Sequence, residues 1–223
     1  MPYKAIRKNP SAPQVAPHII AALHDIPVAA LSDNMHRNIG SVGLQPYHRP
    51  GHKTMAGTAV TVKTRGGDNL AILRAYDFCR PGDVMVVDAG GDTTNALVGG
   101  IMTFAGASLG LAGMVLDGAI RDAAEIGTRT FPVYARGVNH RGPYKDGPGE
   151  INVPITVGGM VVNPGDVIVG DQDGLLAFQP ALAASVIEKA LAQHQKEEAT
   201  MQAIREGRWD RSFVDALEAR CAN

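Results

Sequence analysis

The sequence predicts one α/β domain, built on a mixed sheet that is flanked by helices. Two apolar runs, at 84–88 and 113–117, are typical of strands buried on both faces, and a helix is expected between them over about 94–108. A strand, a helix and a second strand in this order form a βαβ unit, which binds ligands at the carboxyl ends of its strands. The 223 residues, 45% of them hydrophobic and 19% charged, suffice for one large domain with its own core.

The N-terminal part begins with an arm. Residues 1–17 contain several prolines and few large apolar side chains, which predicts an extended segment lying on a surface and a candidate subunit contact. A short helix follows from His18 and is broken at Pro27. Ser32 is then the expected N-cap of a second helix, which ends near Arg37.

A strand and a helix precede the first apolar run, and strands dominate after the second. Alternating Val and Thr over 57–64 predict a half-buried strand. Asp68 is expected to cap the helix that follows, which contains Leu70, Ile72, Leu73 and Tyr76. Further strands are expected at 132–135, 151–157, 167–170 and 175–178.

The C-terminal part is helical. Pro180 begins a long helix with one apolar face, which becomes strongly polar in its second half and ends near Gly207. The expected single domain, including this helix, therefore covers 18–207, and residues 208–223 form a C-terminal tail.

Composition and charge exclude several classes of function. The formal net charge is −1 and the basic residues are scattered, so no basic surface for nucleic acid is expected. Cys79 and Cys221 are too few and too far apart for a disulfide framework. No apolar run approaches the roughly 20 residues that cross a bilayer, and the N-terminus lacks the apolar core of a secretory signal. We therefore expect a cytoplasmic protein with no nucleic-acid and no membrane partner.

Glycines mark a candidate anion site. The helix expected after Gly91 and Asp92 begins with small residues, so N–H groups of its first turn are free to bind a carboxylate or a phosphate. The alternative is a tight strand-to-helix connection, in which glycines are equally common. The glycines match neither GxGxxG nor GxxxxGK[ST], so a dinucleotide or nucleoside triphosphate site is not expected.

Charged residues follow the second buried strand and should emerge at the carboxyl end of the sheet. The guanidinium of Arg121 can form a bidentate pair with a carboxylate. Asp122 and Glu125 share a face if a helix begins here, and they offer oxygen ligands to a hard cation such as Mg²⁺. The alternative is a surface ion pair between Arg121 and Glu125, with Asp122 stabilising the positive end of the helix.

Other catalytic patterns have little support. The seven histidines form no HxH or HExxH arrangement, no serine lies in a GxSxG motif, and Cys79 has no base nearby in the sequence. The polar segment 137–150, rich in glycine and proline, is long enough to be a lid or an interface. Its cationic side chains are candidates to contact a second carboxylate, and a solvated loop is the alternative. These residues are His140, Arg141 and Lys145.

Several motifs together resemble one known family. They are Gly90-Gly91-Asp92, Gly99-Gly100, the stretch 113–122 that ends in Arg121-Asp122, Asn152-Val153-Pro154, Asn163-Pro164-Gly165-Asp166 and the stretch 170–174. In order and spacing, from about Ser32 to the last helix, the chain resembles the family of the regulator of ribonuclease E activity A. That family includes the metal-dependent 4-hydroxy-4-methyl-2-oxoglutarate and 4-carboxy-4-hydroxy-2-oxoadipate aldolases. The resemblance implies an α/β domain with a ββα swivelling arrangement, assembled as a homotrimer or a homohexamer.

The resemblance also implies roles for particular residues. Asp122 would be the direct ligand of a Mg²⁺ or Mn²⁺ ion, and Arg121 would hold the pyruvyl part of a 2-oxo acid substrate. Glu197, from the last helix of a neighbouring subunit, would complete the water shell of the metal, so that the site would be shared between subunits. The substrate-binding residues that the resemblance implies are Gly99, Gly100, Ile101 and Met102, the last two through their backbone amides.

One position departs from the family pattern. The aldolases carry an acidic residue twenty-one positions before the arginine, where this chain has Gly100, and Asp92 is a candidate spatial substitute. The implied activity is that of a carbon–carbon lyase that forms a pyruvate enolate, by decarboxylation of oxaloacetate or by retro-aldol cleavage. Retro-aldol cleavage also needs a base for a hydroxyl proton, so the glycine favours decarboxylation. The alternative is a noncatalytic binding protein that inhibits a ribonuclease, as some members of the family are.

Overall fold

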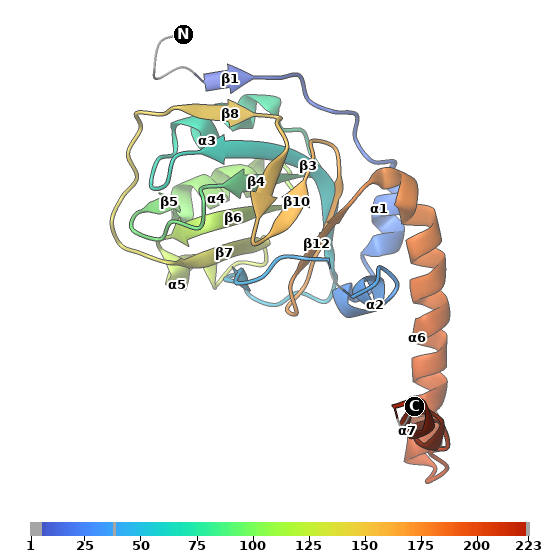
Figure 1. Cartoon of the computed structure of the whole chain (residues 1–223). Coiled ribbons are helices and arrows are strands. Elements are labelled where there is room, and N and C mark those ends of the chain that lie inside the picture. Colours follow the sequence, from blue (N-terminus) through green and yellow to red (C-terminus); the bar gives the residue numbers. More distant parts are fainter. Residues whose placement is uncertain (1–5, 38, 222–223) are drawn as a thin grey trace.

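The computed structural model describes residues 6–37 and 39–221, and a mixed sheet forms its centre (Figure 1). The parallel middle of the sheet has the spatial order β3 (Met55–Thr64), β4 (Asp83–Asp88), β6 (Gly113–Ile120) and β7 (Val133–Val138). Five shorter strands extend it: β8 (Gly149–Ile151) and β1 (Ile6–Lys8) beyond β3, β2 (Gln45–Pro46) beyond β7, and β11 (Val167–Gly170) with β12 (Leu175–Phe178) along the first half of β3. The α/β class with a mixed sheet and flanking helices, predicted from the sequence, is confirmed.

Strands β4 and β6 are buried on both faces, as their apolar runs predicted. Met85 and Met114 belong to the core beneath α3 (Leu70–Ala75), α4 (Gly100–Ser108) and α5 (Ala123–Ile126). Val86 and Val115, one residue further along each strand, belong to the core under the hairpin of β9 (Ile155–Val157) and β10 (Met160–Val162). The alternation of side chains along a strand sends successive residues into these two layers.

Strand β3 corrects one expectation. Its Val and Thr alternation predicted a half-buried strand, but eight of its ten residues are buried. Thr58 Oγ1 accepts a hydrogen bond from the Val15 N–H at 3.0 Å, and the Thr61 hydroxyl donates to the Val153 carbonyl at 2.6 Å. Because their hydroxyls are paired in this way, the threonines can lie in the interior.

The second helix near the N-terminus begins elsewhere than expected. After α1 (Pro17–Leu23), helix α2 covers Val28–Asp33, so Ser32 lies near its end and the prediction of an N-cap there was wrong. The first N–H of α2, on Val28, donates to Asp171 Oδ2 at 2.8 Å. The residue that satisfies this helix start is therefore distant in the sequence and could not be found by local capping rules.

The helix expected from about Thr94 begins later. Gly90 and Gly91 have positive φ and form a turn, which is followed by strand β5 (Ala96–Val98) and only then by α4, at Gly100. Strand β5 pairs with the end of β6, and the Ala96 N–H donates to the Arg141 carbonyl at 2.8 Å. Tertiary pairing thus holds this short segment extended, and the helix start moves from the Gly91 region to Gly99.

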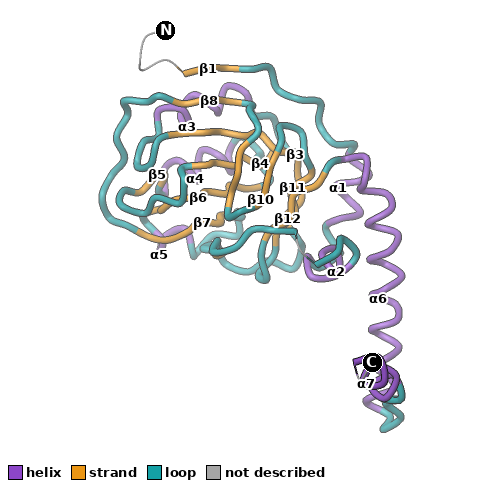
Figure 2. The backbone as a smooth tube through the Cα atoms, in the orientation of Figure 1, coloured by secondary structure: helices purple, strands orange, loops and turns teal. Residues whose placement is uncertain are grey.

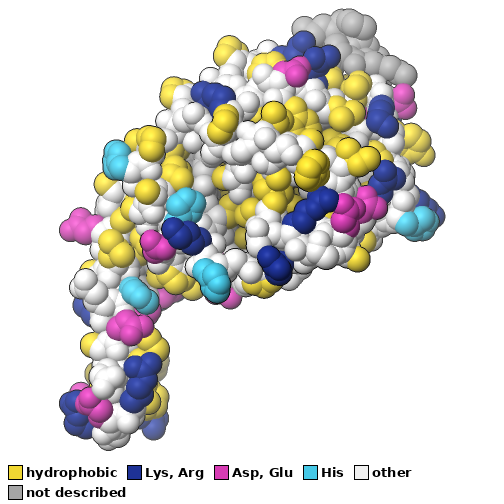
Figure 3. Space-filling model, turned by 180° about the vertical axis from the view of Figure 1, so that it is seen from behind, with side chains coloured by type: hydrophobic (Ala, Val, Ile, Leu, Met, Phe, Trp, Pro, Cys, Tyr) yellow, Lys and Arg dark blue, Asp and Glu magenta, His cyan; other side chains and the backbone are white. Residues whose placement is uncertain are grey.

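The C-terminal helices leave the body of the molecule. After α3 the chain makes a 3-10 turn, η1 (Tyr76–Phe78), and a second such turn, η2 (Pro180–Leu182), precedes α6 (Ala183–Arg205). The first part of α6 packs against α1 and α2, the second part projects, and α7 (Phe213–Cys221) lies at its tip (Figure 1). Charged side chains of both signs gather on this projecting end, whereas hydrophobic side chains are exposed at several places on the body (Figure 3). None of the helices in the described ranges is long and apolar enough to cross a membrane.

Candidate active site

The site is built where β5, β6 and α4 meet. Arg121 follows the last residue of β6, and its N–H donates to the Val98 carbonyl at the end of β5, at 3.0 Å. Gly99 comes next on that neighbouring segment and is the N-cap of α4. The ends of two parallel strands and the start of a helix therefore lie side by side, although the first of these strands, β5, was not expected from the sequence.

Asp122 has an unusual backbone and an unusual partner. Its φ of 58° places it in the left-handed region, which few residues other than glycine adopt. It is the N-cap of α5, yet its side chain does not cap α5. Instead Asp122 Oδ2 accepts a hydrogen bond from the N–H of Gly100 at 2.9 Å, at the start of α4. The carboxylate thus lies at the positive end of a neighbouring helix, where a negative charge is stabilised.

Gly99 is required by this contact and not by its backbone angles. Its φ is −144°, which any residue can adopt. A Cβ at this position would lie 2.9 Å from Arg121 Cγ and still closer to Asp122 Oδ2. Only glycine leaves room for the arginine and the carboxylate to lie against the start of α4.

A cavity of about 200 Å³ opens beside these residues. Arg121 and Asp122 line it, and about half of each side chain is exposed, with 3.8 Å between Arg121 Nε and Asp122 Oδ2. The same two residues also line a more open hollow beside Asn139 and His140. The further lining residues of the cavity are Asn69, Leu73, Leu97, Val98, Gly99, Ile101, Met102, Pro143 and Lys145.

The first turn of α4 offers donors to an anion. The N–H of Gly100 is taken by Asp122 and that of Thr103 by the Gly99 carbonyl. In the described part of the chain no partner is found for the N–H groups of Ile101 and Met102, and both residues line the cavity. Free N–H groups at a helix start, next to a guanidinium, suit a carboxylate ligand. The tight-connection alternative applies instead to Gly90 and Gly91, which lie in a turn before β5.

The space beside Gly100 is not empty. A Cβ on Gly100 would lie 2.9 Å from Glu125 Cδ, so the carboxylate of Glu125 fills the place of a side chain at position 100. Arg129 holds it there, since its guanidinium pairs with Glu125 and also donates to the Gly100 carbonyl at 3.2 Å. The ion pair of Glu125 is therefore with Arg129 and not with Arg121, the partner considered from the sequence. Asp92 is not a spatial substitute, because its carboxylate is bonded to Thr94 and packs on Gly66.

The donor set of this site, within one chain, is a single carboxylate. Among the residues that the structure describes, no group of three or more His, Cys, Asp or Glu side chains could hold a metal. A chelated site of the zinc or calcium type is therefore not formed by one described chain. The carboxylate of Asp122 keeps Oδ1 outside its contact with Gly100. A single carboxylate beside a substrate pocket fits Mg²⁺, which retains several waters and binds through one or two carboxylates plus substrate oxygens.

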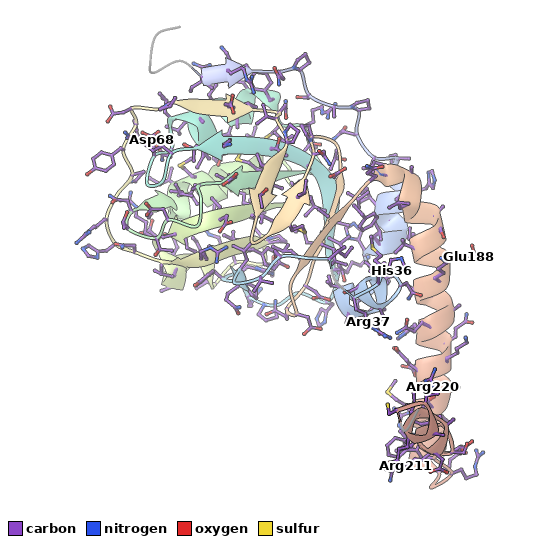
Figure 4. The ribbon with its side chains drawn as sticks, viewed as in Figure 1. His36, Arg37, Asp68, Glu188, Arg211 and Arg220 are labelled. Atoms are coloured by element: carbon purple, nitrogen blue, oxygen red, sulfur yellow. The ribbon has the colours of Figure 1, made fainter. Side chains whose placement is uncertain are left out.

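The long loop between β7 and β8 forms one wall of the cavity, and it runs past the ends of the central strands (Figure 2). Tyr144 bonds to the backbone of Gly67 and Asn69 at 2.8 and 3.0 Å, so the loop is attached to the body rather than solvated on both sides. Asp68, which is fully buried, accepts hydrogen bonds from the N–H groups of Asp146 and Gly147 at 2.7 and 3.0 Å (Figure 4). This fixes Lys145, the neighbour of Asp146, at the cavity.

The other predicted site residue, Glu197, does not join this group within one chain. It lies on α6, where its carboxylate accepts a hydrogen bond from Gln193 at 2.7 Å. Helix α6 is on the opposite side of the molecule from α4 and α5 (Figure 1). Glu197 could therefore reach an Asp122 site only in another copy of the chain.

Sequence reasoning missed one buried residue of the cavity, Asn69. It lies at the N-cap of α3 and is only 2% exposed. The cap of this helix is shared, because Asp68 Oδ1 accepts the Leu70 N–H at 3.0 Å, as predicted for Asp68. That sharing leaves the Asn69 side chain to face β5 and α4. The sequence carried no signal for this orientation.

Comparison with known proteins places the chain in a family. The family model described as "RraA-like: Aldolase/RraA" matches residues 28–177. The chain is 38% identical over 187 residues to a Halalkalibacterium halodurans protein named "Putative 4-hydroxy-4-methyl-2-oxoglutarate aldolase", covering 83% of this chain and 88% of that protein.

Two solved structures have the same fold. The Streptomyces coelicolor protein RraAS2, described as an unusual member of the RNase ES inhibitor RraA family, superposes with a TM-score of 0.77 at 24% identity, covering 85% of this chain and 98% of its own. The RNA-processing inhibitor RraA from Thermus thermophilis superposes with a TM-score of 0.61 at 29% identity, covering 69% of this chain and 92% of its own.

Proposed function

Because this chain belongs to the RraA-like family, we propose that it is a divalent-metal-dependent carbon–carbon lyase that forms the enolate of pyruvate from a 2-oxo acid. One observation carries the proposal. A guanidinium, a carboxylate and the free N–H groups of a helix start meet on one cavity, at Arg121, Asp122 and the first turn of α4.

Arg121 and α4 are proposed to bind the pyruvyl end of the substrate. The substrate carboxylate would accept hydrogen bonds from the N–H groups of Ile101 and Met102, and the guanidinium of Arg121 would face the adjoining 2-oxo group. Donors that are already in place when negative charge develops on that oxygen stabilise the transition state, since they need no reorganisation.

Asp122 is proposed to hold the metal, as Mg²⁺ or Mn²⁺. When bound, such an ion supplies Lewis acidity toward the 2-oxo group. The contact with Gly100 at 2.9 Å fixes the Asp122 carboxylate before any ligand arrives. The left-handed backbone of Asp122 supports a functional role, because strained conformations concentrate at functional sites.

Two reactions fit this machinery. Decarboxylation of oxaloacetate releases CO₂ and leaves the bonding electron pair in the enolate. Retro-aldol cleavage leaves the same enolate but also needs a base for the hydroxyl proton. Since the carboxylate of Glu125 fills the space beside Gly100, we propose it as that base, and the glycine no longer argues against retro-aldol cleavage. The name of the Halalkalibacterium halodurans relative supports the aldol reaction.

The site is proposed to be completed by a second copy, in a homotrimer or a homohexamer. Next to the cavity, Ile101 is 84% and Phe104 60% exposed on α4, which is a large apolar surface for an isolated chain. Glu197 projects on α6, away from the site of its own chain (Figure 1). A neighbouring α6 that covers α4 would bury the apolar surface and bring Glu197 to the water shell of the metal.

The test is metal-dependent release of pyruvate from oxaloacetate and from 4-hydroxy-4-methyl-2-oxoglutarate. Arg121→Ala should lower kcat/KM by at least about 100-fold, the size of effect seen when one preorganised donor is removed. Arg74→Ala is the control, because Arg74 is an exposed arginine of α3 that pairs with Asp77 of η1, outside the cavity. Retained turnover in Arg121→Ala would reject the role of Arg121.

The second candidate function is that of a noncatalytic inhibitor of RNA processing. The likeness to the Thermus thermophilis RraA favours it. The same assay separates the two functions. If the wild-type protein released no pyruvate with Mg²⁺ or Mn²⁺ from either compound, the lyase proposal would fail and the inhibitor would remain.

A further inference from the structure

One residue of the cavity wall carries a buried polar atom without a partner. Asn69 lines it together with Arg121 and Asp122, and only 2% of the residue is exposed. In the described part of the chain, Asn69 Oδ1 has no hydrogen-bond partner. A buried amide oxygen left unpaired costs about 1–3 kcal/mol, so such an atom in a cavity wall is a candidate acceptor for a donor on the ligand.

The orientation of this amide is fixed by its surroundings. Asn69 Nδ2 donates to the Leu97 carbonyl at 3.0 Å and lies 3.3 Å from the sulfur of Met102. A carbonyl oxygen can only accept a hydrogen bond, so turning the amide over would set two acceptors against each other. Oδ1 is therefore the atom left for a ligand, and the ligand must bring a donor.

Such a donor is what one of the two candidate substrate classes supplies. The other polar groups on the cavity are the N–H groups of Ile101 and Met102 and the cations Arg121 and Lys145, which suit carboxylates, and the carboxylate of Asp122. A hydroxyl group is an uncharged donor of the size that Oδ1 can accept. The hydroxylated substrate of an aldol cleavage carries one, and oxaloacetate in its keto form carries none.

We propose that Asn69 is a specificity-determining residue, whose Oδ1 accepts a hydrogen bond from the hydroxyl group of a 4-hydroxy-2-oxo acid. This inference rests on the proposed lyase function and chooses between its two reactions. The protein then selects hydroxylated 2-oxo acids over oxaloacetate.

The hydrogen bond between the substrate hydroxyl and Asn69 Oδ1 contributes to substrate binding. In the cleavage the C3–C4 bond breaks, its electron pair enters the pyruvate enolate, and the hydroxyl proton passes to a base as the C4 carbonyl forms. An amide oxygen cannot take that proton, so the hydroxyl must turn from Asn69 to the base first. The hydrogen bond therefore stabilises bound substrate more than the transition state, and its loss should raise KM more than it lowers kcat.

The test compares the two substrates in the variant Asn69→Leu, which removes the acceptor at similar volume. We expect KM for 4-hydroxy-4-methyl-2-oxoglutarate to rise by about 10-fold or more, from the loss of a paired buried group. We expect KM for oxaloacetate to change by less than about threefold. Asn69→Asp, which keeps an acceptor oxygen, should raise KM for both substrates but preserve the ratio of the two KM values.

Leu73→Ala is the matched comparison, because Leu73 lines the same cavity from the same helix without a polar atom. Leu73→Ala should change KM for both substrates by the same factor. An equal rise in KM for both substrates in Asn69→Leu would show that Asn69 only holds the strand that contains Leu97. That result would overturn the proposal. An unchanged KM for both substrates would also overturn it.

Failure of the proposed lyase function can be distinguished from failure of the proposed role of Asn69. If the wild-type protein turns over neither compound, 4-hydroxy-4-methyl-2-oxoglutarate is an inert ligand, and its Kd can be measured by titration calorimetry beside that of 2-oxoglutarate, which lacks the hydroxyl. A preference for the hydroxylated compound that disappears in Asn69→Leu supports the contact with Asn69. No preference, or no binding, contradicts it.

Discussion

Gly99 shows how one small residue determines the geometry of this site. The arginine and the aspartate that follow β6 lie against α4 only because no side chain stands between them and the helix start. The motif of paired glycines is visible in the sequence, but the two glycines are required for different reasons. Gly99 makes room for Asp122 and Arg121, and Gly100 makes room for Glu125.

Gly99→Ala tests this spatial argument. The added methyl group should displace the Asp122 carboxylate from the Gly100 N–H, because φ at this position already suits alanine and the backbone has no reason to move. We expect weaker Mg²⁺ binding by titration calorimetry and a loss of kcat/KM on the order of 10-fold. Gly51→Ala, where the methyl group meets nothing within 4 Å, should change neither.

Glu125→Gln tests the carboxylate beside Gly100. The amide cannot act as a base, so retro-aldol cleavage should fall by about 100-fold or more, whereas decarboxylation, which requires no such base, should be much less affected. The measurement is pyruvate release from each compound by the same enzyme preparation. Equal loss of both activities would assign Glu125 to the support of Arg129 alone.

At the scale of elements, a buried carboxylate is one of the groups that hold the loop between β7 and β8. Asp68 Oδ2 accepts from Arg65, Asp146 and Gly147 at 2.7 to 3.1 Å, and it has no exposed surface. Hydrogen bonds to a charged group are stronger than those to a neutral one. Asp68 therefore adds to the backbone hydrogen bonds of Tyr144 in fixing the loop wall of the cavity.

Asp68→Asn should loosen that loop. One side-chain oxygen becomes a donor, and the lost charge-assisted hydrogen bonds should lower the free energy of unfolding by about 1–3 kcal/mol. Amide hydrogen exchange should accelerate at Asp146 and Gly147. Asp77→Asn, at an exposed ion pair in η1 beyond the end of α3, should leave the exchange of the loop unchanged.

At the scale of the whole molecule, stability should depend on the titration of His48. Burial lowers the pKa of this histidine, and the contact with the Val133 backbone offsets the effect in part. The folded state therefore resists protonation. The contribution of His48 to the free energy of unfolding should be constant above the ordinary histidine pKa of about 6.5 and fall as the pH drops below it, because the unfolded state then binds the proton more readily. Urea unfolding at pH 7.5 and 5.0 should show a smaller difference in His48→Gln than in the wild-type protein.

The proposed assembly predicts complementation between two inactive variants. If Glu197 serves the site of a neighbouring copy, mixed oligomers from co-expressed Arg121→Ala and Glu197→Gln chains contain some intact sites. Pyruvate release should then exceed that of either variant alone. Activity no higher than that of the variants alone would place Glu197 outside the site.

The sequence by itself determined the α/β class, the two buried strands and the position of Arg121 and Asp122 at the end of the second one, because hydrophobic patterning and short turns are local properties. Tertiary structure decided the rest. Helix α2 begins at Val28 because Asp171 accepts its N–H, β5 replaces the start of a predicted helix because β6 pairs with it, and Glu125 replaces Asp92 beside Gly100. In each case the deciding partner is distant in the sequence, so only the folded chain brings it into contact.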